Sequence, residues 1–181
     1  MRFRSLLLFS MLALSACGEK PAEKAPASPT TAYGTPQEVN SYMIAVDALV
    51  LQLNGVHQEL YAQVGSSGKA TGANLAPAME QGRPKLVQIL AELDNLKAPA
   101  LLVPFHQQVR KVAQLRLDAY SQTLEGWTLE QAKAANFASR YSRSEELLAE
   151  AQELGLPLGE ERNRIQEALV AVQGPAQAAT R

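Results

Sequence analysis

A charged residue within an apolar stripe is the feature of this sequence that most suggests chemistry. Arg116 falls on the inner face of the third predicted helix, where a cation must be paired or hydrated. In a bundle of antiparallel helices His57 would lie at the same level, and Gly82 would leave room beside them. A guanidinium group presents a planar fork of donors to carboxylates and phosphates, so we expect a small pocket for an anionic ligand. Its predicted residues are His57, Arg83, Arg116 and Tyr141.

Two purely structural roles remain open for the same arginine. The side chain could extend outward to water along its aliphatic stem. It could also pair with a carboxylate such as Glu145, because a buried cation is tolerated when a counter-charge neutralises it. Either role would leave the bundle without a ligand pocket.

The two histidines raise a third interpretation, a haem-binding or metal-binding bundle. His57 and His106 both lie on apolar stripes, but antiparallel connections would separate them by roughly 13 Å along the helices. A metal ion needs each ligand nitrogen within about 2.1 Å, which excludes these two histidines as ligands of one ion. A pairing of His106 with Met43 remains open, but we predict no metal site and no cofactor. Gly68-Lys69 matches the glycine-lysine pair of a phosphate-binding loop motif. The earlier glycine and the following serine or threonine that this motif requires are missing from the sequence. No nucleophile stands next to a convincing base, and we therefore predict that the protein is not an enzyme.

These residues must be positioned by helices, because apolar residues recur at three-residue and four-residue steps in four long segments. We expect helices over residues 36–64, 75–96, 99–126 and 128–155. Thr128 and Gln131 have the spacing of a capping box at the start of the fourth helix. Gly155-Leu156-Pro157 is typical of a helix end. Pro84 is expected to face solvent within the second helix.

A shorter helix is predicted from Leu158 to Gly174. Short connections make neighbouring helices antiparallel. The sequence therefore predicts an all-α protein, an up-down-up-down four-helix bundle with a short fifth C-terminal helix. Ile44 and Leu51 lie beside the main stripe of the first helix and form the expected seat of the fifth.

The N-terminus has the pattern of a secretory signal. Arg2 and Arg4 precede an apolar run that ends in Leu14-Ser15-Ala16-Cys17, and Cys17 is the only cysteine. This segment resembles the lipobox of bacterial lipoproteins, in which cleavage precedes the cysteine and its sulfur receives a diacylglycerol. The resemblance implies a signal peptide over residues 1–16 and a bilayer anchor at Cys17. The alternative is ordinary cleavage that leaves a free thiol. The apolar run is far shorter than the roughly 20 residues that span a bilayer.

The remaining boundaries follow from composition. Residues 17–36 are spaced by prolines and nearly free of large apolar groups, which predicts a disordered tether. We expect the helical domain over residues 37–174 and a flexible tail over residues 175–181.

Charge and context narrow the expected partners. The net charge of −1 offers no basic footprint for nucleic acid. In lipoproteins of this kind an aspartate after the cysteine favours inner-membrane retention, and here the residue is Gly18; the resemblance implies the outer membrane, facing the periplasm. We expect a membrane-anchored, non-enzymatic interaction module that binds an unknown envelope protein. The alternative is a bundle that binds a small anionic ligand.

Overall fold

A computed structural model describes residues 30–67 and 70–178. The predicted signal peptide, Cys17, most of the tether and residues 179–181 lie outside this range. The described residues form four α-helices and one 3₁₀ turn, with no strand among them, so the prediction of an all-α fold is confirmed. The elements are α1 (Pro36–Ser67), α2 (Gly72–Asn95), η1 (Ala100–Leu102), α3 (Val103–Gln131) and α4 (Phe137–Ala178).

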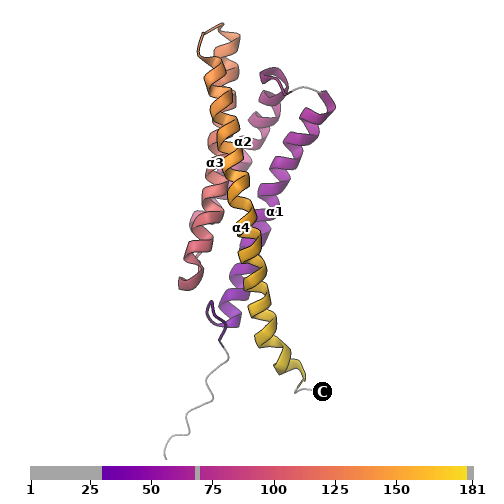
Figure 1. The fold of residues 1–181 in the computed structure, drawn as a ribbon, viewed down its shortest axis with the longest axis vertical. Helices are drawn as coiled ribbons and strands as arrows, with labels where there is room; N and C mark the ends of the chain where they lie inside the picture. Colours follow the sequence, from indigo (N-terminus) through magenta and orange to yellow (C-terminus); the bar gives the residue numbers. More distant parts are fainter. Residues whose placement is uncertain (1–29, 68–69, 179–181) are drawn as a thin grey trace, which may run out of the picture.

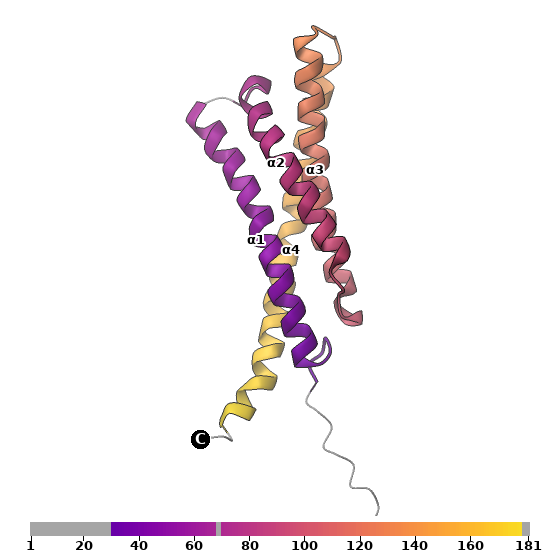
Figure 2. The same ribbon diagram turned by 180° about the vertical axis from the view of Figure 1, so that it is seen from behind.

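The helices lie alongside one another, each packed against the next in the chain (Figure 1). Helices α3 and α4 share the most extensive contact, and α2 packs on α3. Helix α1 rests mainly on α2 and touches α4 over only a short stretch. The view from behind shows the same arrangement, with α1 and α4 crossing at about the middle of α1 (Figure 2). The seam between α1 and α4 is therefore the least tightly closed side of the molecule.

The core forms where the sequence places its apolar stripes. In α1 the buried side chains recur at three-residue and four-residue steps, and in α2 they do so after its first turn, which confirms these two stripes. Helix α2 continues through Pro77 and Pro84, and Pro84 is exposed as predicted. The core side chains of these two helices include Val39, Met43, Val46, Leu53, Val56, Leu60, Met79, Leu86, Ile89 and Leu93.

Helix α1 is also long and apolar enough, over Pro36–Gly65, to cross a membrane by length and composition alone. The core helix of a soluble protein passes the same test. In the structure its apolar stripe contacts the other helices, with Val39, Val46 and Leu53 almost completely buried. This burial is what packing within a bundle requires.

The predicted boundary between the third and fourth helices is wrong. Helix α3 continues through Gly126 to Gln131, and α4 begins only at Phe137. Thr128 does not cap a helix, because its hydroxyl donates a 3.0 Å hydrogen bond to the carbonyl oxygen of Leu124 in the preceding turn. A Cβ at Gly126 would lie 2.9 Å from the ring of Tyr141. This glycine therefore permits close packing of α4 on α3 and does not end the helix.

The prediction of a separate fifth helix is also wrong. Residues 137–178 form one continuous helix, α4. Gly155, Leu156 and Pro157 are all exposed, so the backbone bond that Pro157 removes can be replaced by water. Leu147, Ala151, Ile165 and Leu169 remain buried on either side of the proline, and this continuous apolar face holds the helix together. The helix extends to Ala178, beyond the expected start of the tail at residue 175.

The expected seat of the fifth helix is exposed. Ile44 is 65% and Leu51 is 75% accessible to solvent. The C-terminal part of α4 approaches an adjacent face of α1, where Arg162 donates from Nε and Nη2 to Asp47 at 2.7 and 2.9 Å. The end of the predicted tether also contacts α4, because the hydroxyl of Tyr33 donates to Glu161 at 3.1 Å. These polar contacts, and not Ile44 and Leu51, join the C-terminal part of α4 to α1 and to the segment before it.

Candidate binding site between α1, α3 and α4

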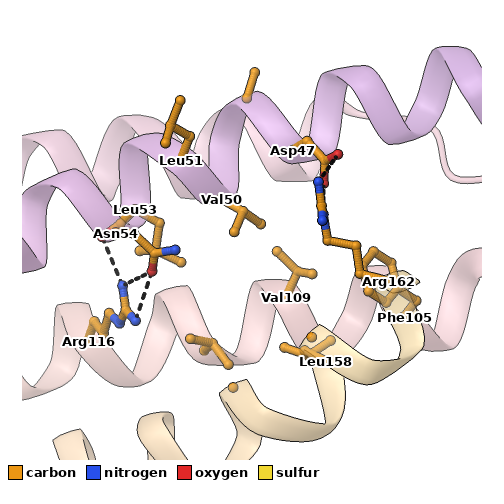
Figure 3. A pocket seen from close by; sticks show the side chains of 14 residues that line it. Asp47, Val50, Leu51, Leu53, Asn54, Phe105, Val109, Arg116, Leu158 and Arg162 are labelled. Carbon is orange, nitrogen blue, oxygen red and sulfur yellow. Dashed lines mark hydrogen bonds and ion pairs between the residues drawn. The ribbon is translucent and has the colours of Figure 1, made fainter. Parts of the chain in front are cut away.

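Arg116 extends from α3 toward α1 and is half-buried. Its Nη1 donates a 2.8 Å hydrogen bond to the carbonyl oxygen of Leu53, and Nη1 and Nη2 each donate to Oδ1 of Asn54 at 3.3 Å (Figure 3). The expected alternative partner, Glu145, lines a different cavity. The contacts of Arg116 with protein are thus to neutral oxygen atoms of α1.

One edge of this guanidinium is open. Of its five N–H groups, Nε–H and the second Nη2–H have no hydrogen-bond partner among the described residues, and no described carboxylate forms an ion pair with Arg116. Arg110 and Arg162 use that same Nε and Nη2 edge to bind Asp94 and Asp47. The open edge of Arg116 therefore has the geometry that binds a carboxylate or phosphate through two parallel hydrogen bonds.

The environment of Arg116 is unfavourable for an unpaired cation. Burial lowers the pKa of its guanidinium below its ordinary value, an effect that the nearby phenols of Tyr120 and Tyr61 oppose. The group nevertheless stays charged at neutral pH, because an arginine side chain is not deprotonated in proteins. An anion beside the open edge would relieve the cost of burying this charge.

A cavity of about 590 Å³ extends from Arg116 between the three helices. This volume lies in the range of small-molecule sites. Arg116 lies at one end, and the ion pair of Asp47 with Arg162 lies at the other (Figure 3). The wall between them is largely aliphatic and aromatic. Its apolar side chains include Val50, Leu53, Phe105, Val109, Val112 and Leu158.

Two glycines form the part of the wall that α4 contributes. Gly155 and Gly159 both line the cavity and lie one helical turn apart. A Cβ built on either would meet no atom of the described part of the chain within 4 Å. Helix α4 therefore presents bare backbone here, and the cavity owes part of its width to these two residues.

A second cavity of about 340 Å³ lies on the other side of Arg116. His57, Tyr61 and Leu156 line it together with the arginine. The rings of His57 and Tyr61 meet edge to face with centroids 4.5 Å apart. Burial, and secondarily the charge of Arg116, lower the pKa of His57 below 6.5, so its imidazole is neutral at pH 7. Its Nδ1 is buried and has no hydrogen-bond partner among the described residues.

The structure thus brings together two of the four predicted ligand-binding residues, His57 and Arg116. Arg83 is exposed, donates from Nε to Ser121 at 3.3 Å, and lines neither of these cavities. Tyr141 donates a 2.6 Å hydrogen bond to Glu130 and shares a further cavity with His57.

The sequence predicts that Gly82 leaves room beside Arg116 and His57, and this prediction is wrong. A Cβ there would lie 2.7 Å from Cε2 of Tyr120 and 3.1 Å from Val56. The ring of Tyr120 fills the space beside Gly82, which leaves no room there for a polar layer. This glycine serves close packing of α2 against α3.

His106 lies in a separate part of the domain, where its Nδ1 is 3.2 Å from the hydroxyl of Tyr42. Within residues 30–67 and 70–178, no group of three or more histidine, cysteine or acidic side chains could hold a metal ion. The sequence interpretation missed Asn54, Gly155 and Gly159 as parts of the site. The four-residue spacing of the two glycines is a signal for them, although Gly155-Leu156-Pro157 alone is typical of a helix end.

Comparisons of the chain with protein-family models, with curated proteins and with solved structures found no match.

Proposed function

We propose that this protein is a membrane-anchored lipoprotein of the bacterial envelope whose helical domain is a non-enzymatic binding module. The anchor rests on the lipobox-like segment Leu14–Cys17, and Gly18 favours the outer membrane, facing the periplasm. We further propose that the four helices run up-down-up-down, with the α1–α4 seam as the binding face. Cavities on both sides of Arg116 along this seam support that assignment.

The ligand of this module is proposed to be a small anion or a molecule with an anionic group. One observation carries the proposal: the half-buried Arg116 has no counter-charge among the described residues and keeps its Nε and Nη2 edge open. Such an edge binds carboxylate or phosphate in two parallel hydrogen bonds. The neutral imidazole of His57 in the adjoining cavity adds a polar group without adding charge.

A thermal-shift screen of carboxylates and phosphates against Arg116→Met tests this proposal. A ligand at a hundred times its Kd stabilises the folded state by about 2.7 kcal/mol, and this stabilisation should disappear in Arg116→Met. Arg83→Met is the matched control, because Arg83 is exposed and lines neither cavity. An anion that stabilises all three proteins equally, or no stabilising anion at all, would refute the proposal.

A protein partner is the second candidate, favoured by apolar side chains exposed on α1 and α4. Ile44 and Val170 are 65% and 66% accessible, and exposed apolar groups are a feature of interaction surfaces. Cross-linking in intact membranes should recover a partner with the wild-type protein and lose it with Ile44→Asp. Val87→Asp, at a half-exposed position of α2, should still recover it. Equal recovery with both variants would contradict a partner on α1.

A further inference from the structure

We infer that the ligand bound by Arg116 is a single-chain amphiphile, with a carboxylate on the open guanidinium edge and an apolar body in the cavity between α1, α3 and α4. This inference rests on the proposed anion binding at Arg116. It adds the chemical class of the ligand and the direction in which it lies.

The shape of the cavity requires an apolar body. Its charged groups stand at the two ends, Arg116 at one and the Asp47–Arg162 pair at the other (Figure 3). Along α1 these ends correspond to Asn54 and Asp47, seven residues apart, which is about 10 Å of helix. The walls of this span are mostly aliphatic. A small hydrated anion would fill only the Arg116 end, whereas an alkyl chain would cover the apolar walls along this length.

The charges at the far end also restrict the ligand. Both Nε and Nη2 of Arg162 are engaged by Asp47, so this arginine has no matching open edge. Of the two cavity arginines, only Arg116 has a free Nε and Nη2 edge and lacks a carboxylate partner within the described residues. Charge complementarity therefore places a single acidic head at Arg116 and directs the tail toward Arg162.

The glycine wall supports an elongated occupant and provides a test. Gly155 and Gly159 leave open space above the backbone of α4, so a chain can lie against α4 along a full turn. Because Gly159 lines the cavity and a Cβ there would meet no atom of the described residues within 4 Å, we expect a larger side chain at this position to extend into the cavity. Because glycine is unfavourable within a helix, Gly159→Leu should fold at least as well as the wild type while it excludes the ligand.

The experiment is calorimetric titration of the mature chain carrying Cys17→Ser with decanoate, below its micelle concentration, and with acetate. Decanoate should bind the parent protein at least tenfold more tightly than acetate does. Gly159→Leu should weaken decanoate binding at least tenfold. Gly55→Leu is the matched control, because Gly55 also lies in a helix with open space around it but lines none of these cavities, and it should bind decanoate like the parent.

Each outcome bears on one proposal or the other. If acetate and decanoate bind the parent equally and Arg116→Met, titrated in the same way, binds neither, the anion site stands and the amphiphile is refuted. If neither binding requires Arg116, both proposals fail. If Gly159→Leu binds decanoate like the parent, the tail does not occupy this cavity.

Light scattering that shows a dimer in the parent and a monomer in Gly159→Leu would instead identify a second copy as the occupant and overturn the inference. Should Gly159→Leu lose its helical circular dichroism, Gly159→Ala takes its place with a smaller expected loss.

Discussion

Arg116 on α3 donates a 2.8 Å hydrogen bond from Nη1 to the backbone carbonyl oxygen of Leu53 on α1. The side chain of Leu53 is buried in the core, so this acceptor is held in place by packing. The contact uses the terminal edge of the guanidinium and leaves the Nε side free. The cation is thus oriented before any ligand arrives, which lowers the entropic cost of binding.

The packing around this contact predicts a contrast between two leucines on α1. Leu53→Asp should destabilise the domain by about 3–5 kcal/mol, because it buries a charge without a counter-charge. Leu51→Asp, two residues away and 75% exposed, should change stability by no more than about 0.5 kcal/mol. Urea denaturation followed by circular dichroism measures both. Equal stability of the two variants would contradict the assignment of the inner face of α1.

Two glycines in helices should respond oppositely to alanine. In Gly82→Ala the new Cβ would lie 2.7 Å from the ring of Tyr120, and the resulting overpacking should cost about 1–3 kcal/mol. In Gly55→Ala the Cβ would meet no atom within 4 Å, and the better helix propensity should stabilise the protein by about 0.5–1 kcal/mol. Chemical denaturation of both proteins checks the signs. Stabilisation by Gly82→Ala would contradict close packing of α2 on α3.

The helices could be predicted from the sequence because their buried stripes are local patterns. The boundaries at Gly126 and Gly155–Pro157 could not, because local helix-ending signals were overruled by tertiary contacts. Gly126 lies under the ring of Tyr141, and Pro157 stands on an exposed face of a helix whose opposite face stays buried. Whether a glycine ends a helix or admits a neighbour depends on what lies beside it in three dimensions.

The candidate site was predictable only in part. A cation on an apolar stripe identified Arg116, and bundle layers placed His57 near it. The same comparison of residue levels along the helices failed for Gly82 and Arg83. Such levels do not show that the ring of Tyr120 occupies the space beside Gly82. The open edge of Arg116 depends on rotamers and on Asn54, and no sequence spacing encodes these.

The stability of the protein should fall in mild acid. Burial and the charge of Arg116 lower the pKa of His57 in the folded state, so the unfolded chain binds more protons as the pH drops through about 6.5. The contribution of His57 to stability is therefore present above that pH and is lost below it. His106, whose pKa burial also lowers, acts in the same direction. His57→Gln should reduce the loss between pH 7.5 and 5.5 in urea denaturation; a loss unchanged by His57→Gln would contradict this origin.

The effect of the Arg116 charge on the pKa of His57 can be measured directly. The titratable groups that line the adjoining cavity together with His57 are Arg116 and the phenol of Tyr61. Removal of the positive charge in Arg116→Met should raise the pKa of His57, as followed by the imidazole NMR resonances during a pH titration. A lower pKa in this variant would contradict the proximity of the two side chains.

Attachment to the membrane should depend on Cys17. Each buried methylene of an acyl chain contributes about 0.8 kcal/mol to membrane binding, so Cys17→Ser should move the protein from the membrane fraction to the soluble fraction after centrifugation. Among the described helices, α1 alone is long and apolar enough to provide another attachment. A Cys17→Ser protein that sediments with membranes as fully as wild type would contradict the lipid anchor.

The central claim, that the free edge of Arg116 binds an anionic group, is tested most directly by NMR of the arginine Nε–H groups. In the mature Cys17→Ser chain, titration with decanoate should shift the Nε–H resonance of Arg116 and slow its exchange with water. The Nε–H groups of Arg110 and Arg162, already bound to Asp94 and Asp47, should change far less. An unchanged Arg116 resonance at saturating decanoate, or equal shifts at all three arginines, would contradict the account.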